Sequence, residues 1–414
     1  MNAPTTPPPD KKLARQIIER VGSSGQPPEE GLNYFSVGLD PYLSIIDKEY
    51  LNDYIRDGGS AFKMVIGIYG GGKTHFLYSI RQLAWNRNYA VAYVSLKSSG
   101  ECPFYALELV YKEIAGSILP PLPIDERMNS SHRGIGALLE SWYGQQFAMY
   151  RQEGMSIDKT RERLDEEIRQ IEIGPSISFG KAIRSALEAV HNEDKKSFSN
   201  ICQWLYGERY DRKIHTRYGI QQKIDRTTAM NMIRSLGQAV RALGYTGLVI
   251  LLDEAERVPS LSTKNREQHL SNLRELIDEC SQSRFAGIMV FYAVPDENFL
   301  NGRTQVYEAL NQRLSTVLWS SNPTGVKIML EDMIEDHGEF LRQVGERLAW
   351  IYSIAFEHEF PPNDRDLLIT LIAEWAERAR YGDEGYKRLF VQKLIQGLGI
   401  LHREGRIPDI DELG

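Results

Sequence analysis

The chain has 414 residues, enough for two or three packed units, with 49 lysines and arginines against 56 acidic residues and a net charge of −7. Proteins that coat nucleic acid by bulk charge are usually basic, so this balance excludes that class and restricts any nucleic-acid contact to a local patch. Three widely spaced cysteines form no metal-ligand pattern, and no apolar run approaches the roughly 18–20 residues of a membrane span, which predicts a reduced, cytoplasmic protein without membrane contact.

The N-terminal part reads as a short tail followed by helices. Residues 1–10 are rich in proline and lack the basic and apolar regions of a signal peptide, which predicts a disordered tail. Asp10 can cap a helix whose Leu13 and Ile17 share one face, and "GSSGQPPEEG" ends that helix. A second helical stretch, rich in tyrosine, leucine and isoleucine, follows it. Together they predict an N-terminal helical segment over 11–58.

Alternating strands and helices begin after residue 58. Five short apolar runs predict strands: "FKMVI", "YAVAYVSL", "GLVILL", "AGIMVFYA" and "VKIML". Helical patterns between them imply a parallel sheet covered on both faces, so we expect an α/β core over 59–330. The stretch from about 122 to 243 has no strand pattern, and it reads as a helical insertion between the second and third strands. Residues 331–414 read as helical.

A glycine-rich loop directly follows the first predicted strand. The sequence "GIYGGGKT" fits the spacing G-x-x-x-x-G-K-[ST] between a strand and a helix, as a phosphate-binding loop requires. In such a loop Lys73 reaches the β- and γ-phosphates, and the Thr74 hydroxyl binds Mg²⁺. The alternative is a surface glycine turn with a solvated lysine. The residues predicted to cradle the phosphates are Gly67, Gly70, Gly71, Gly72, Lys73 and Thr74. His75 is expected to cap or pack beside them rather than catalyse.

The third predicted strand ends in two adjacent carboxylates, Asp253 and Glu254. Ligands of open parallel sheets bind at the carboxyl ends of strands, so Asp253 is placed to hold the Mg²⁺ shell as a Walker B aspartate. Glu254 is placed to orient or deprotonate the attacking water. The alternative is a loop that merely begins with two acidic residues. A glutamate here suggests the P-loop ATPases with an extra strand between the phosphate-loop and Walker B strands, and the absence of an "NKxD" sequence favours ATP over GTP.

With these motifs the chain resembles the AAA+/STAND-like ATP-binding proteins of bacterial BREX phage-defence systems, in particular their D-type subunit. The resemblance rests on "RQIIERVGSSGQPPEEGLNYFSVGLD", "DGGSAFKMVIGIYGGGKTHFL", "GLVILLDEAERV" and "FAGIMVFYAVPDENF", and it spans most of residues 11–400. It implies an AAA+-like P-loop ATPase that uses ATP and Mg²⁺, has a helical lid over 331–414 and forms a homo-oligomer. It also implies other defence proteins as partners, often including a helicase, in recognising or processing phage DNA.

The resemblance implies three further functional positions. A sensor at the tip of the strand next to Walker B matches Tyr292, where relatives more often carry Asn, Ser or Thr, and a tyrosine packed at a strand end is the alternative. An arginine finger after the next helix matches Arg313, with Arg303 in reserve. A second sensor near the start of a lid helix matches Arg388 in "EGYKRLFVQKLI". For these arginines the alternative is a solvated surface side chain.

One segment combines basic and aromatic residues. Residues 206–226 carry six lysines and arginines against three acidic residues, with Tyr206, Tyr210 and Tyr218 interleaved. Such a pattern can contact the backbone and the bases of DNA. A solvated helical surface with ordinary tyrosine anchors is the alternative.

Three functions follow as hypotheses. The leading one is an ATP-hydrolysing AAA+-type module that drives or gates a DNA-directed defence assembly. The second is a nucleotide-dependent switch or scaffold with little turnover, which the tyrosine at the sensor position favours. The third is an origin-recognition-like DNA loader. It needs a winged-helix domain after the lid, but the lid takes up most of the residues that follow the fifth predicted strand.

Overall fold

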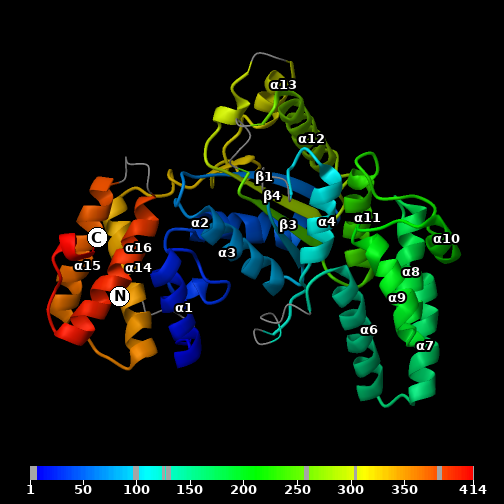
Figure 1. Ribbon diagram of the computed structural model, residues 1–414, viewed down its shortest axis with the longest axis horizontal. Coiled ribbons are helices and arrows are strands. Elements are labelled where there is room, and N and C mark those ends of the chain that lie inside the picture. Colours follow the sequence, from blue (N-terminus) through cyan, green and yellow to red (C-terminus); the bar gives the residue numbers. More distant parts are fainter. Residues whose placement is uncertain are drawn as a thin grey trace.

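A five-stranded parallel sheet forms the centre of the molecule (Figure 1). The computed structural model describes residues 7–96, 102–123, 126, 132–255, 261–302, 305–379 and 385–413. The strand order is β2-β3-β4-β1-β5, so β4 separates β1 from β3, as the glutamate after β3 suggested. The predicted strands and the α/β class are confirmed. The strands are β1 (Ser60–Ile66), β2 (Ala90–Ser95), β3 (Leu248–Asp253), β4 (Ile288–Val294) and β5 (Lys327–Met329).

Helices cover both faces of the sheet, which explains the continuous apolar runs in the strands. Every residue of β1, β3 and β4 is buried. The first face packs against α4 (Leu107–Ser117), α11 (Ala229–Ala242) and α12 (Thr263–Ser281). The second face packs against α2 (Asp40–Ile45), the π-helical η2 (Ile46–Tyr54) and α3 (Lys73–Asn86). The short elements η6 (Asn298–Leu300) and α13 (Gln305–Arg313) follow β4.

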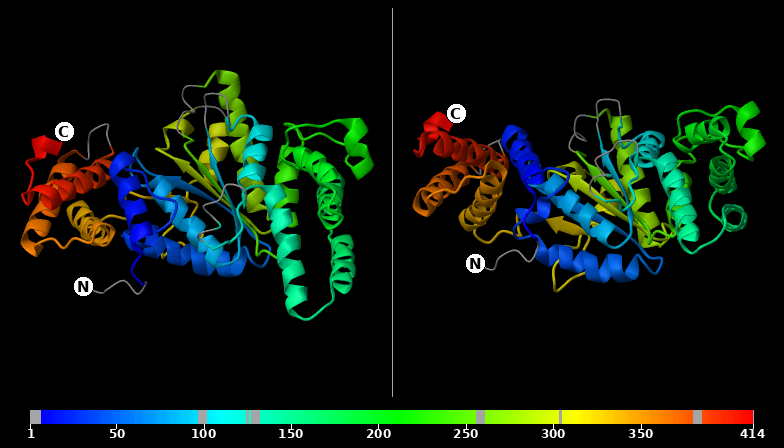
Figure 2. Two further views of the ribbon diagram at one scale, coloured as in Figure 1. Left: turned by 60° about the horizontal axis from the view of Figure 1, so that its bottom comes forward. Right: turned by 90° about the horizontal axis from the view of Figure 1, so that it is seen from below.

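An arm of helices lies between β2 and β3 in the chain. Figure 2 shows this arm at the opposite side of the sheet from the C-terminal helices. Its buried side chains, such as Leu138, Ile183 and Leu205, belong to the same apolar core as the first face of the sheet. The arm therefore extends that core rather than building one of its own. Its members are α6 (Ile135–Gln152), α7 (Ile157–Gln170), α8 (Ile177–His191), α9 (Lys195–Leu205), α10 (Arg212–His215) and η4 (Thr216–Tyr218).

A separate core joins the two ends of the chain. Ile17 of the first helix packs with Leu348 and Phe390 of the C-terminal helices, whereas Tyr42 and Leu51 pack under the sheet. The segment 11–58, which the sequence presents as one unit, thus divides its buried side chains between two cores. Helical periodicity shows which side chains are buried but not which core receives them. The helices of this second core are α1 (Lys11–Ser24), α14 (His337–Phe356), α15 (Pro362–Arg378) and α16 (Tyr386–Glu404), with η1 (Leu32–Tyr34) and η8 (Ile410–Leu413) beside them.

Two expectations from composition concerned the cysteines, expected to be reduced, and membrane-spanning helices, expected to be absent. Cys102, Cys202 and Cys280 are all buried and form no disulfide among themselves. Over the part of the chain that the structure describes, no helix combines the length and apolar character needed to cross a bilayer.

Candidate nucleotide-binding site

The glycine-rich loop lies between β1 and α3, at the carboxyl edge of the sheet. Gly70 and Gly72 have φ angles of 66° and 100°, in the left-handed region that glycine adopts without strain. Gly72 is the N-cap of α3, whose first turn has no side-chain cap and no acidic residue. No side chain therefore caps the first N–H groups of α3, an arrangement that is compatible with an anion at this helix end.

The loop lysine lies against the loop backbone, and the loop threonine lies against the end of β3. The Nζ of buried Lys73 donates hydrogen bonds to the carbonyl oxygens of Gly67 at 2.9 Å and Ile68 at 3.2 Å. Thr74 Oγ1 donates to Asp253 Oδ2 at 2.7 Å, which joins residues 179 positions apart. A threonine hydroxyl that donates its proton keeps its lone pairs for a cation. This donor set fits Mg²⁺, which usually takes only one or two protein groups together with phosphates and water.

Two further groups contact the Asp253 carboxylate, which is 1% exposed. The hydroxyl of Tyr93, on β2, donates to Oδ2 at 2.7 Å, and the backbone N–H of Glu254 donates to Oδ1 at 2.8 Å. Nothing in the sequence marks Tyr93, because it lies inside an apolar strand with no motif around it. Across the described residues, no group of three or more histidine, cysteine or acidic side chains could hold a metal by itself.

Glu254 lies on the wall of the same site. Its φ angle of 59° places it in the left-handed region, which is uncommon for a residue with a side chain and is often found at functional sites. The Ser95 hydroxyl, at the end of β2, donates a hydrogen bond to Glu254 Oε2. The structure therefore brings Glu254, Asp253, Lys73 and Thr74 together, with the glutamate held by the neighbouring strand.

A cavity of about 510 Å³ opens beside the loop, within the usual size range of small-molecule sites. Its polar lining includes the loop, both carboxylates, Lys387 and Arg388. Its apolar lining comes from α1, the segment after it, α14 and α16. This amphipathic lining suits a ligand with a phosphate tail and an uncharged ring. Apolar lining residues include Val21, Pro27, Phe35, Val37, Leu39, Leu341, Val344, Phe390 and Val391.

His75 lies in this cavity between the loop and the N-terminal segment. Its Nε2 is 2.6 Å from Ser36 Oγ, and its ring meets Phe35 edge to face at 5.2 Å. Desolvation, together with the positive charge of Lys387, lowers the pKa of His75 to about 4. The imidazole is therefore neutral at neutral pH and packs beside the loop.

Two basic residues at the start of α16 also line the cavity. Arg388 donates to the carbonyl oxygen of Ser24 and to the hydroxyl of Tyr69, each at 2.9 Å. Lys387 donates to the carbonyl oxygen of Gly71 at 2.9 Å and forms an ion pair with Glu331 at 3.0 Å. The "G-x-x-R" pattern pointed to Arg388 and missed Lys387, which contacts the glycine-rich loop directly.

The structure does not bring Tyr292 into the cavity. Tyr292 is opposite Leu252 in the register of β3 and β4, so its side chain lies on the face of the sheet opposite to Asp253. There it is fully buried, and its hydroxyl is 2.7 Å from His269 Nε2. The next residue, Ala293, shares the face of Asp253 and is apolar. Tyr292 therefore lies as the alternative from the sequence expected, as a tyrosine packed at a strand end.

His269 leads to a prediction about acid stability. Burial lowers the pKa of His269 to about 3, from an ordinary value of 6.5. The unfolded chain therefore binds more protons below pH 6.5, and the free energy of unfolding should fall as the pH falls, by up to about 1.4 kcal/mol per pH unit for this group. Urea unfolding between pH 6.5 and 5 measures the slope, and His269→Gln should make it shallower. Equal slopes in the two proteins would contradict the assignment.

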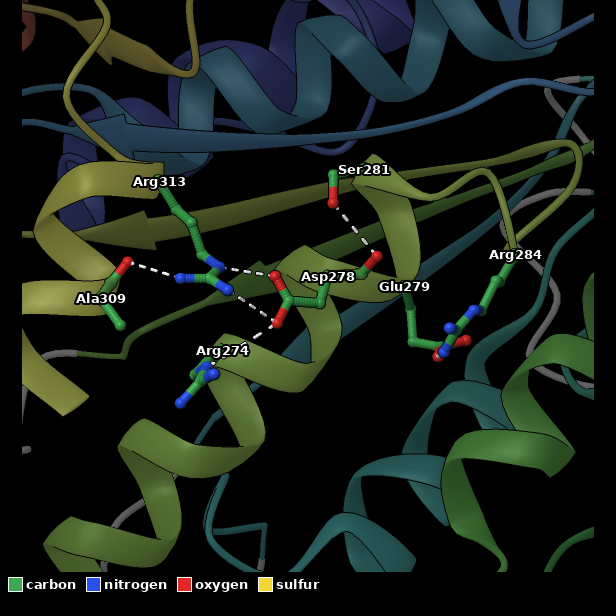
Figure 3. A network of polar contacts seen from close by, with 7 residues as sticks. All are labelled: Arg274, Asp278, Glu279, Ser281, Arg284, Ala309 and Arg313. Atoms are coloured by element: carbon green, nitrogen blue, oxygen red, sulfur yellow. Dashed lines mark hydrogen bonds and ion pairs between the residues drawn. The ribbon is translucent and has the colours of Figure 1, made fainter. Parts of the chain in front are cut away.

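Arg313 forms an ion pair within the chain, away from the cavity (Figure 3). Its Nε and Nη2 lie 2.5 and 3.1 Å from the carboxylate oxygens of Asp278 on α12, and its Nη1 donates to the carbonyl oxygen of Ala309 at 2.9 Å. Arg274 also faces Asp278. Action of Arg313 on a neighbouring subunit would require this bidentate pair to open. Arg303, the reserve candidate, lies outside the described residues.

The basic segment 206–226 is exposed, but its tyrosines are not. Tyr206 accepts a hydrogen bond from the N–H of Gly136, Tyr210 stacks on His215, and Tyr218 donates to Ser197. These contacts, and the partial burial of all three rings, anchor the tyrosines in the arm. The six basic side chains remain on the surface: Arg209, Arg212, Lys213, Arg217, Lys223 and Arg226.

The family described as "BREX system ATP-binding protein BrxC/D" matches residues 10–411, nearly the whole chain. No curated protein and no solved structure matches the chain. The matched range includes the phosphate loop, both carboxylates and the helices that close the cavity. The chain therefore belongs to the BrxC/D family of ATP-binding proteins, which serve BREX phage defence.

Proposed function

We propose that this protein binds ATP with Mg²⁺ and hydrolyses it, and that hydrolysis drives or gates a DNA-directed BREX assembly. The observation that supports this most is the hydrogen bond from Thr74 to Asp253, with Glu254 beside it on the cavity wall. A glycine turn with a solvated lysine would need no buried lysine and no bond to a distant aspartate. The expected partners are other BREX components, further copies of the chain, and DNA at the exposed basic side chains of 206–226.

Each residue of the site has a separate part in this proposal. Lys73 exchanges its bonds to loop carbonyls for bonds to the β- and γ-phosphates. Thr74 and Asp253 would hold Mg²⁺, which would neutralise charge on the phosphate oxygens. Glu254 accepts the proton of the attacking water on one carboxylate oxygen, while the Ser95 hydroxyl donates to the other, Oε2. Lys387 and Arg388 place α16 over the phosphate loop.

The first test is steady-state ATP hydrolysis by the purified full-length protein with Mg²⁺, alone and with single- and double-stranded DNA. We expect turnover that depends on Mg²⁺ and rises with DNA. Turnover that ignores DNA would remove DNA from the proposal and leave a protein partner as the activator. ATP binding without turnover under all of these conditions would overturn hydrolysis.

A second function, a nucleotide-dependent switch, has two observations in its favour. Ser95 engages Glu254, and β4 presents the apolar Ala293 on the face of Asp253 where a polar sensor is expected. In a switch, ATP binding rearranges α16 and the arm, and hydrolysis is slow. The same assay separates the two functions, since a switch binds ATP with little turnover.

A further inference from the structure

From the residues that the structure describes, the Asp253 carboxylate accepts three hydrogen bonds. Two hydroxyls, those of Thr74 and Tyr93, donate to Oδ2, each at 2.7 Å. The N–H of Glu254 donates to Oδ1 at 2.8 Å. A carboxylate offers about four lone-pair positions, so these donors leave one, on Oδ1. Thr74 belongs to the phosphate loop and Glu254 is the adjacent residue, whereas Tyr93 comes from another strand and has no part in the predicted machinery.

Side chains from α3 and the N-terminal segment hold Tyr93 in place. Its ring meets that of Tyr78 edge to face at 5.1 Å. The guanidinium of Arg81 lies 4.2 Å from the Tyr78 ring centroid. Arg81 is 5% exposed and donates to the carbonyl oxygen of Glu29 at 2.7 Å. Because each group is packed against the next, the Tyr93 hydroxyl has little freedom to leave Asp253.

We propose that Tyr93 is a positioning residue for the Mg²⁺ of the ATP site. It occupies the second lone pair of Asp253 Oδ2 and so keeps Oδ1 as the oxygen available to the metal shell. Tyr93 is absent from the lining of the cavity, so it acts on the metal through Asp253 and not on the nucleotide. This inference rests on the proposed binding of ATP with Mg²⁺.

Loss of the Tyr93 hydroxyl should therefore affect the metal and spare the nucleotide. Without the Tyr93 hydroxyl the Asp253 carboxylate can rotate about its Cβ–Cγ bond, since one of the two donors to Oδ2 is gone. Partners that orient a metal-binding group typically change metal affinity by about 10- to 100-fold when they are removed. The affinity for nucleotide without Mg²⁺ should stay unchanged, because phosphate contacts come from the loop and α3.

The experiment measures the affinity of the full-length protein for a fluorescent ATP analogue over a Mg²⁺ titration and in excess EDTA. In Tyr93→Phe the Mg²⁺ concentration for half-maximal binding should rise about 10-fold or more, with the EDTA affinity unchanged. Tyr89→Phe is the matched control. Tyr89 directly precedes β2, and its buried hydroxyl donates to the carbonyl oxygen of Leu51 at 2.6 Å, away from Asp253. We expect no change in its Mg²⁺ requirement.

Two results would overturn the assignment of Tyr93: an unchanged Mg²⁺ requirement in Tyr93→Phe, or an equal shift in Tyr89→Phe. A wild-type protein whose nucleotide binding ignores Mg²⁺ would overturn the metal site itself, so failure of the proposed function is seen separately. If Tyr93→Phe does not fold, Tyr78→Leu replaces it, because it removes the ring that supports Tyr93. The Mg²⁺ requirement should then rise as well, and an unchanged value would overturn the proposal.

Discussion

Glu254→Gln should lower steady-state ATP hydrolysis by about 100- to 10,000-fold, the usual contribution of a positioned general base. An amide has the same shape as the carboxylate but cannot accept a proton from water. Lys73, Thr74 and Asp253 keep their contacts, so ATP binding should stay within about twofold of the wild-type value, as expected when only a group acting in the transition state is lost. The Glu254 side chain is exposed, so the change should leave the fold intact.

Glu357→Gln is the matched control for that variant. Glu357 is exposed and has a left-handed φ of 52°, close to that of Glu254, but it lies at the end of α14 outside the cavity. The Glu357→Gln protein should hydrolyse ATP at the wild-type rate. Phosphate release measures turnover, and equilibrium binding of ATP measures occupancy. Wild-type turnover in Glu254→Gln would remove Glu254 from the chemistry and leave the water without an assigned base.

Lys73→Met should weaken ATP binding by about 10- to 100-fold, because hydrogen bonds to charged groups contribute about 1.5–3 kcal/mol each. Methionine keeps most of the volume of this buried side chain, so the expected loss comes from the ammonium group. ADP affinity should fall less than ATP affinity, since ADP lacks the γ-phosphate. Calorimetric titration with both nucleotides measures the two losses.

Lys63→Met separates this effect from the loss of any buried lysine. Lys63, on β1, is 2% exposed and donates to the Tyr50 hydroxyl and the Gly325 carbonyl oxygen, away from the cavity. Nucleotide affinity in Lys63→Met should match the wild type, with thermal unfolding measured beside it to show that the variant is folded. Wild-type affinity in Lys73→Met would show that the loop does not use its lysine for phosphate.

The order of secondary structure could be predicted from the sequence, and the boundaries of the larger units less so. Continuous apolar runs identified all five strands, because a strand buried on both faces cannot contain many polar residues. The division of 11–58 between two cores was not predicted. Helices with similar apolar faces can pack on different partners, and only the folded chain shows that α1 joins α14 and α16.

The sequence by itself determined the glycine-rich loop between β1 and α3 and the two carboxylates after β3, since contiguous backbone and adjacent residues form these features. Only the tertiary structure decided which distant side chains join them. Tyr93, Ser95 and Lys387 reach the site from β2 and α16, where no local pattern marks them. The tertiary structure also placed Tyr292 on the face of the sheet opposite to Asp253, because a shift of one residue along a strand reverses the face on which a side chain lies.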